Sequence, residues 1–149
     1  MKKLSIFLGG TCSNSTWREE LLKKLNGDTI DAFNPVVPDW TLECQKEEDY
    51  HKENDDINLF VITPEANSPY SLFEIGVESS VHPERTVVCF LDNQNGTQFS
   101  KQQAKAYAKI AQDLNGKVAV YDNLDDLAAD LNRAAEIKAT KTEQEDLSF

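Results

Sequence analysis

Two acidic residues occupy positions from which they could act together on one substrate. Asp56 comes directly before the apolar run 57–62, which reads as a buried strand, and Glu74 follows on the first turn of a predicted helix. A carboxylate at the start of a strand and another on the following helix can converge at one edge of a sheet. Such a pair can divide the roles of nucleophile and proton donor. The sequence therefore predicts acid-based chemistry here.

Glu74 also has a structural explanation. The segment Ser71-Leu72-Phe73-Glu74 fits the capping-box pattern, in which the glutamate bonds back to the amide of the serine. Periodicity alone favours this interpretation. Against it, Glu78 follows one turn later, and like charges at this spacing are mildly unfavourable on a helix. The apolar neighbours Phe73 and Ile75 would raise the pKa of Glu74 in a partly closed site.

Loop residues supply further candidates for a pocket. Gly9-Gly10 follows the first predicted strand, where it either lets a ligand approach the backbone or makes the turn into the next helix. The pair fits neither the dinucleotide fingerprint nor the P-loop. Trp40 lies in a loop with no helical stripe to explain it, which indicates a pocket wall. Trp17 shares a stripe with Leu21 and is assigned to the core instead.

Strand and helix patterns alternate along the whole chain. Predicted strands cover residues 4–8, 29–33, 57–62, 86–91 and 117–121, and predicted helices cover 16–25, 41–54, 71–81, 100–115 and 124–137. This alternation predicts a doubly wound α/β fold with a five-stranded parallel sheet in the flavodoxin-like order 2-1-3-4-5. The ligand crevice is expected at the carboxyl ends of strands one and three. We expect one domain over residues 1–137 and a polar, loosely held tail over 138–149.

Composition narrows the classes of partner. The net charge of −11 over 149 residues argues against a nucleic-acid polymer or an anionic membrane, but it leaves a small molecule open. The three cysteines form no CxxC motif and there are only two histidines, so we expect neither a metal site nor a disulfide framework. A reducing cytoplasm is the default location for such a chain. No apolar run approaches the length of a membrane span.

Four motifs in order resemble the nucleoside 2-deoxyribosyltransferase family. They are Gly-Gly after the first strand, Asn34-Pro35 after the second, DDINLFVITP, and SPYSLFEIGVES, together spanning about residues 4–92. The resemblance implies that Glu74 is the nucleophile and that Asp56 takes part in proton transfer with the base. The chemistry suits these residue types, because a carboxylate can stabilise and then trap an oxocarbenium-like C1′. The sugar would then pass to another base or to water.

The residue at position 68 bears on which reaction is expected. Members that transfer deoxyribose usually carry an aspartate six residues before the nucleophile, whereas this chain has Ser68. Related 2′-deoxynucleoside 5′-monophosphate N-glycosidases place a phosphate-contacting serine there. A serine can donate a hydrogen bond to a phosphate that an aspartate would repel. Both acceptors, a base or water, therefore stay open, as does the requirement for a 5′-phosphate.

The resemblance also implies the remaining features of the site. A nucleoside or nucleotide would be bound without any metal or organic cofactor. The expected contacts on the sugar or phosphate side are Gly9, Gly10, Ser68 and Ser71. Three further candidates for the same pocket come from the loop after strand two, namely Asn34, Asp39 and Trp40. A homo-oligomer is implied, with each pocket completed by a neighbour and residues 147–149 as a candidate contact.

A rival of another class rests on the first loop. Residues 11–16 are rich in hydroxyl groups and resemble the phosphate loop of flavodoxins, and the length and acidity suit an FMN-binding electron carrier. The later FMN loops, with their flanking aromatic residues, are not found around residues 91–95. A scaffold without catalytic activity is also open, because loops can diverge while a fold persists.

Overall fold

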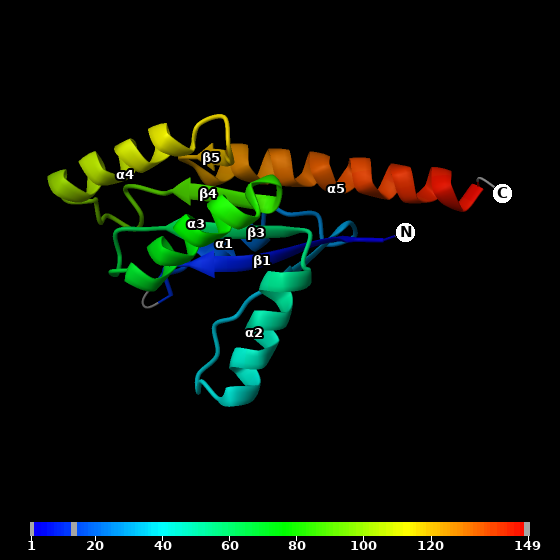
Figure 1. Cartoon of the computed structure of the whole chain (residues 1–149), viewed down its shortest axis with the longest axis horizontal. Helices are drawn as coiled ribbons and strands as arrows, with labels where there is room; N and C mark the ends of the chain where they lie inside the picture. The colour runs from blue at the N-terminus through cyan, green and yellow to red at the C-terminus, as the bar shows by residue number, and fades with distance from the viewer. Residues whose placement is uncertain (1, 13–14, 148–149) are drawn as a thin grey trace.

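The computed structural model describes residues 2–12 and 15–147, and its centre is one parallel sheet (Figure 1). Five strands form the sheet in the order β2-β1-β3-β4-β5, and every neighbouring pair is parallel. Their bounds are β1 Leu4–Gly10, β2 Ile30–Phe33, β3 Ile57–Ile62, β4 Thr86–Phe90 and β5 Ala119–Tyr121. The predicted fold class and strand order are confirmed.

Helices cover both faces of the sheet, which is why its central strands are apolar throughout. In β3, Leu59, Phe60 and Val61 are fully buried although successive side chains point to opposite faces. One face packs against α1 (Trp17–Leu22) and α5 (Leu124–Leu147), and the other against α3 (Pro69–Val81) and α4 (Lys101–Leu114). A short 3₁₀ turn, Pro83–Arg85, leads into β4. Trp17 belongs to the first core, as expected.

Helix α2 (Leu42–Asn54) differs from the other helices in that it projects away from the sheet (Figure 1). Its start is fixed by Thr41, whose side chain accepts a hydrogen bond from the amide of Cys44. None of its residues is buried. Apolar packing therefore does not hold this helix in place, and other contacts must do so.

The last helix is longer than predicted. Helix α5 continues to Leu147, so the predicted helix end at residue 137 was wrong. Ala135 and Ala139 are both buried and carry the packed stripe past the predicted end at Ile137. The residues that follow are good helix formers, which polarity alone did not reveal. Ser148 and Phe149 lie outside the described residues. Within 2–12 and 15–147, no helix is long and apolar enough to cross a membrane.

Candidate active site

A cavity of about 270 Å³ opens where β1 ends and α3 begins. It lies at the carboxyl ends of β1 and β3, which is where a doubly wound sheet binds its ligand. Side chains from β1, α1, α2 and α3 contribute to it. Its lining consists of Phe7, Gly9, Gly10, Cys12, Arg18, Pro35, Glu48, Lys52, Asn67, Ser68, Pro69, Tyr70, Ser71 and Glu74.

Glu74 lines this cavity and does not cap its own helix. Helix α3 begins at Pro69, a residue well suited to the first helical position, with Ser68 as the N-cap residue. Ser71 thus lies inside the helix, and the capping-box interpretation was wrong. The Glu74 carboxylate instead accepts a hydrogen bond from Nζ of Lys52 at 3.0 Å. The carboxylate is therefore oriented by a residue of α2.

The Lys52–Glu74 pair is largely shielded from solvent. The side chains are 18% and 13% exposed, respectively. Burial raises the pKa of Glu74, and the ammonium of Lys52 opposes this shift without cancelling it. Burial lowers the pKa of Lys52, but Glu74, with smaller contributions from Tyr70 and Asp49, outweighs burial, so the pKa of Lys52 lies above its usual value. The site thus holds a carboxylate that ionises at higher pH than an ordinary glutamate.

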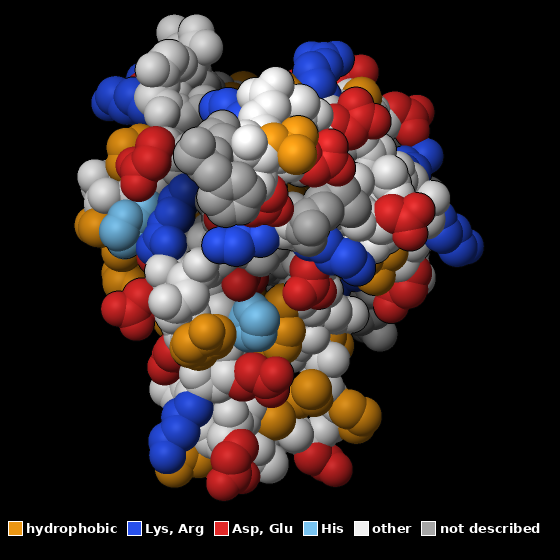
Figure 2. Space-filling view, turned by 90° about the vertical axis from the view of Figure 1, so that its right-hand side faces the viewer, with side chains coloured by type: hydrophobic (Ala, Val, Ile, Leu, Met, Phe, Trp, Pro, Cys, Tyr) orange, Lys and Arg blue, Asp and Glu red, His pale blue; other side chains and the backbone are white. Residues whose placement is uncertain are grey.

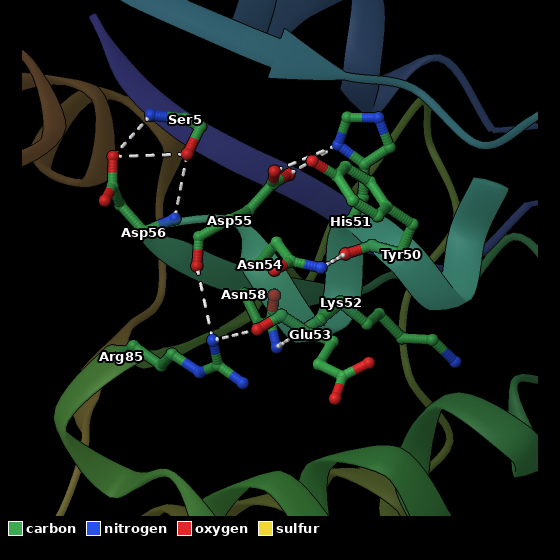
Figure 3. Close-up of polar contacts among 10 residues, drawn as sticks. All are labelled: Ser5, Tyr50, His51, Lys52, Glu53, Asn54, Asp55, Asp56, Asn58 and Arg85. Carbon is green, nitrogen blue, oxygen red and sulfur yellow. Dashed lines mark hydrogen bonds and ion pairs between the residues drawn. The ribbon is translucent and has the colours of Figure 1, made fainter. Parts of the chain in front are cut away.

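Two polar side chains hold the C-terminal end of α2 against the sheet (Figure 3). The side-chain amide of Asn58 donates to the carbonyl of Lys52 at 2.9 Å, and Arg85 donates to the carbonyl of Glu53 at 2.7 Å. The last carbonyls of a helix have no partner within it. These two bonds satisfy such carbonyls and place Lys52 at the cavity.

A ring stack adds a second anchor for α2. The imidazole of His51 stacks on Phe33 of β2, with ring centroids 3.8 Å apart and planes 8° from parallel. Its Nδ1 lies 2.9 Å from the carboxylate of Asp55, which follows the helix. Burial raises the pKa of Asp55, and the contact with His51 opposes the shift. The last turns of α2 are therefore tied to the edge of the sheet.

Asp56 lies away from the cavity. Its carboxylate accepts hydrogen bonds from the amide and hydroxyl of Ser5, at 2.9 and 3.1 Å, and pairs with Lys138 of α5 at 2.5 Å. Figure 3 shows this carboxylate turned toward Ser5, while the amine of Lys52 extends in the opposite direction. Asp56 directly precedes β3 at its amino end, whereas Glu74 lines the cavity at the carboxyl ends of the strands. The structure does not bring the two acids together.

The surroundings of Asp56 suit an ionised structural group. Burial raises its pKa, but the bonds from Lys138 and Ser5 outweigh burial and leave the pKa below its ordinary value. The corresponding side of the molecule carries acidic and basic side chains intermixed (Figure 2). Asp56 links β1, β3 and α5 at this end.

The two glycines of β1 line the cavity and also serve the sheet. Gly10 has φ +121°, and a Cβ at this position would lie 2.0 Å from the carbonyl oxygen of Val61 in β3. A Cβ on Gly9 would lie 2.8 Å from the ring of Phe60. Glycine is thus required at position 10 by the close approach of β1 and β3, whatever the cavity binds.

Hydroxyl groups gather on the side of the cavity next to the glycines. Ser68 and Ser71 both line it, and Ser71 is buried. The hydroxyl of Ser68 lies 2.8 Å from that of Thr11, which itself accepts a hydrogen bond from the amide of Thr63. These groups could bond to hydroxyl or phosphate oxygens of a ligand.

The loop after β2 reaches the cavity only through Pro35. Asn34 is exposed and its side chain accepts a hydrogen bond from the amide of Val36, as in an Asx turn. Asp39 is exposed, and Trp40 is 62% exposed. The structure thus places Asn34, Asp39 and Trp40 outside the cavity lining.

Sequence reasoning missed Arg18 as a residue of the site. Its guanidinium is buried against the ring of Trp17, 4.4 Å from the centroid, and burial lowers its pKa. Nε donates to the carbonyl of Leu8 at 3.0 Å, and Nη1 to that of Thr11 at 2.8 Å. Arg18 therefore fixes the end of β1 and brings a positive charge to the cavity.

Glu48 and Lys52 were missed for another reason. They lie one turn apart on a helix whose composition is almost wholly polar, so nothing in their spacing separated a cavity wall from a solvated surface. Charged residues at this spacing usually form a solvent-facing pair. The short connection between α2 and β3 could have identified them. Because α2 ends at Asn54 and β3 begins at Ile57, the last turns of the helix must lie close to the sheet.

A larger hollow of about 850 Å³ lies between α4 and α5. Its wall includes Phe90 and Tyr107, stacked with ring centroids 5.0 Å apart. The Asp130 carboxylate in its wall pairs with Arg133, whose side chain is 70% exposed, whereas the side chain of Lys52 beside Glu74 is 18% exposed. Among the described residues, no group of three or more His, Cys, Asp or Glu side chains is placed to hold a metal ion. We therefore assign the chemistry to the smaller cavity.

Comparison with known proteins places these observations in a family. The model for "Nucleoside 2-deoxyribosyltransferase like" proteins matches residues 3–94, which hold β1 to β4, Glu48, Lys52 and Glu74. The chain belongs to this family. The nucleoside 2-deoxyribosyltransferase-like family consists of enzymes that act on nucleosides, and the resemblance seen in the motifs is confirmed.

A solved structure supports the fold of this family member. It is that of a 2-deoxyribosyltransferase from the psychrotolerant bacterium Bacillus psychrosaccharolyticus, with a TM-score of 0.51 and 14% sequence identity. The similarity covers 85% of this chain and 95% of the other. At this identity the match speaks for the fold alone. A search of curated protein sequences gave no match.

Proposed function

We propose that this family member cleaves the N-glycosidic bond of 2′-deoxynucleosides and transfers the deoxyribosyl group to another base, with Glu74 as the nucleophile. The observation that carries the proposal is the cavity at the carboxyl ends of β1 and β3, into which Glu74 presents a carboxylate held by Lys52. Family membership supplies the class of substrate.

The reaction follows from the chemistry of a carboxylate at C1′. The Glu74 carboxylate attacks C1′ as the C1′–N bond breaks, and the bonding pair leaves with the base. The product is a glycosyl ester of Glu74. A second base then attacks C1′, the ester bond breaks, and Glu74 returns as a carboxylate. Two displacements at the same carbon retain its configuration.

The remaining wall suits the sugar side of such a substrate. Ser68 and Ser71 offer hydroxyl donors, and the backbone of Gly9 and Gly10 presents no side chain to keep a ligand away. We assign these four residues to sugar or phosphate contacts. Because Asn34, Asp39 and Trp40 lie outside the lining, we do not include them.

A second candidate activity is hydrolysis of 2′-deoxynucleoside 5′-monophosphates by the same nucleophile. Ser68 favours it, because this hydroxyl lies in the cavity where an aspartate would repel a phosphate. The cations Arg18 and Lys52 line the same cavity. The FMN carrier has less support: its sheet order is the same, but the family match points to nucleosides. Ser13 and Asn14 of its phosphate loop lie outside the described residues.

We also propose that the protein forms a homo-oligomer through α3. The outer side of this helix exposes Tyr70, Phe73, Val77 and Val81, which recur at helical spacing and form one apolar stripe. Tyr70 lines the cavity as well, so the stripe reaches the rim of the site. A second copy on this stripe would help to close the cavity.

Incubation with substrates tests the proposal. Deoxynucleosides and their 5′-monophosphates are supplied with and without a second base, and free base and exchanged product are measured by chromatography. Base exchange identifies a transferase, and free base alone identifies a hydrolase. The variant Glu74→Gln should lower turnover by about 1,000-fold or more with folding intact, because an amide cannot form the glycosyl ester.

Glu78→Gln is the matched control for this variant. Glu78 lies one turn further along α3, accepts a hydrogen bond from Asn58, and does not line the cavity. Glutamine can accept the same bond, so activity should stay close to that of the unmodified protein. Undiminished turnover in a well-folded Glu74→Gln variant would defeat the proposal.

A further inference from the structure

The hollow of about 850 Å³ between α4 and α5 is a second place where a ligand could bind. It follows the edge of the sheet at which β5 is the last strand, and α4 and α5 lie on either side of that strand (Figure 1). Among the described residues, its lining and that of the smaller cavity have none in common. A ligand in this hollow would therefore be separate from the reaction proposed for Glu74.

The wall of the hollow offers an apolar surface. Phe90 of β4 stacks on Tyr107 of α4, and Phe99 meets Tyr107 edge to face with ring centroids 4.8 Å apart. The helices contribute small side chains that leave the space between them open, namely Ala104, Ala108, Ala111 and Ala129. Binding sites for small molecules commonly have this volume and a lining of this kind. The wall thus suits the apolar body of a ligand.

Negative charge gathers around this apolar surface. Four aspartates from three parts of the chain belong to the lining: Asp92 after β4, Asp122 after β5, and Asp126 and Asp130 on α5. Asp130 pairs with Arg133 at 3.4 Å. None of the other three belongs to an ion pair among the residues that the structure describes. The hollow therefore carries negative charge that no cationic side chain neutralises.

Two of these carboxylates are held close to each other. The side-chain amide nitrogen of Asn123 donates to Asp122 and to Asp126, at 2.9 Å in each case. Both carboxylates thus lie beside one nitrogen atom, and that neutral amide does not cancel their charge. Like charges at such short range are unfavourable, and a cation placed between them would be stabilised by both.

The charge and the short edge strand argue against two larger occupants. A second copy of this chain would bring a net charge of −11 to a surface that is itself negative. A peptide added as a further strand would pair with β5, but β5 has only three residues, so it offers few backbone groups. A small positively charged ligand meets neither objection.

We propose that this hollow is a binding site for a small organic amine, in which an apolar body is joined to an ammonium group. The body would lie against Phe90 and Tyr107, and the ammonium would donate hydrogen bonds to Asp122 and Asp126. An ammonium carries three donors and no acceptor, which matches carboxylates that accept only. Binding involves no covalent step.

Three small molecules test the two parts of this recognition by isothermal titration calorimetry with the unmodified protein. Tryptamine has an aromatic body and an ammonium and should bind. Indole-3-acetate has the same ring with a carboxylate and should bind at least about tenfold more weakly. Methylammonium has the charge without the body and should also bind at least about tenfold more weakly than tryptamine.

Variants of the hollow assign the binding to it. Asp122→Asn/Asp126→Asn should raise the Kd for tryptamine by about tenfold or more, because charge-assisted hydrogen bonds are lost. Ala108→Phe places a ring in the hollow without a change of charge and should raise the Kd by a similar factor. Asp28→Asn/Asp146→Asn is the matched control: it makes the same change in net charge at exposed positions outside the lining, and should change the Kd by less than about threefold. Circular dichroism checks the fold of each variant.

Several results would overturn the inference. They are no binding of tryptamine, equal binding of tryptamine and indole-3-acetate, and equal weakening in the two double variants. A dimer in light scattering that Ala108→Phe converts to a monomer would overturn it too, because a second copy would then fill the hollow. Failure of the deoxynucleoside assay would refute the proposed function and leave the amine site standing.

Discussion

The Lys52–Glu74 ion pair determines the pH at which the candidate nucleophile is ionised. Burial raises the pKa of Glu74, and Lys52 is the nearby charge that pulls it down. A nucleophilic carboxylate must be ionised, so activity should fall as the pH drops through this raised pKa. The acidic limb of the pH profile therefore lies above the usual range of a glutamate.

Removal of Lys52 should shift this limb further. In Lys52→Met, burial of Glu74 is no longer opposed by the ammonium, so the pKa of Glu74 rises and the acidic limb of kcat/KM moves to higher pH by about one unit. Lys52→Arg keeps the positive charge and should leave the limb near its original position. Profiles of kcat/KM against pH measure the effect. A limb unmoved in Lys52→Met would show that the pair does not control ionisation.

Individual site residues were predictable only where a motif marked them. Glu74 stands in a motif whose order and spacing point to the nucleophile. Asp56 was chosen because it directly precedes a strand. This position in the sequence does not determine which neighbour the side chain contacts. Lys138, which binds the Asp56 carboxylate, is 82 residues further along the chain. Glu48 and Lys52 look like solvent-facing charges until the end of their helix is located.

At the level of elements, α2 is held by hydrogen bonds more than by apolar contacts. It buries none of its residues, and Asn58 and Arg85 bond to the carbonyls of its last turn. Asn58 is fully buried, and its amide also donates to Glu78 at 3.3 Å. The position of one cavity wall thus depends on a polar side chain of β3.

Asn58→Ala should loosen this wall. It leaves the Lys52 carbonyl without its partner, which should lower the free energy of unfolding by about 1–3 kcal/mol. Because Glu48 and Lys52 move with α2, kcat/KM should fall by more than the small change in stability explains. Urea denaturation and steady-state kinetics give the two values.

Asn54→Ala serves as the control, because Asn54 is exposed and its side chain donates to the carbonyl of Tyr50 in the same helix. This variant should change the free energy of unfolding by less than about 0.5 kcal/mol. If Asn58→Ala behaves in the same way as Asn54→Ala, the anchoring role of Asn58 is refuted.

Most elements could be predicted because local signals mark their ends. The helix predicted over 41–54 starts within one residue of α2, and the apolar run 57–62 matches β3 from end to end. The end of α5 could not be predicted, since its last turns are polar and only the burial of Ala139 shows that the helix continues. A hydrophobic pattern predicts a helix only when apolar residues recur over several turns, and a single alanine is too weak a signal to extend the predicted helix.

For the whole molecule, the exposed stripe on α3 predicts the state of assembly. Phe73 is 63% exposed at the centre of that stripe, and a charge there would oppose burial against a second copy. Phe73→Glu should shift the protein to a monomer of 16.8 kDa, as measured by size-exclusion chromatography with light scattering. Ile137→Glu, on the half-exposed side of α5, should not change the mass. Unmodified protein that is already monomeric would contradict the proposed assembly.

The overall architecture was the most predictable level, because alternation of strands and helices restricts a parallel sheet to few topologies. All residues that line the candidate cavity lie within the region that the family model matches, residues 3–94. Lys138 lies beyond that region, on α5. One of the contacts that hold Asp56, its ion pair with Lys138, therefore comes from the part of the chain outside the match.

The projection of α2 from the sheet has a thermodynamic consequence. Separation of this helix from the sheet would expose little apolar surface, since none of its residues is buried. Heat capacity and denaturant m-values scale with the surface exposed, so both should be small for this local opening. Global unfolding exposes both cores and has large values. The free energy of opening the cavity wall should therefore change little with temperature and urea concentration. The free energy of global unfolding should change steeply over the same range.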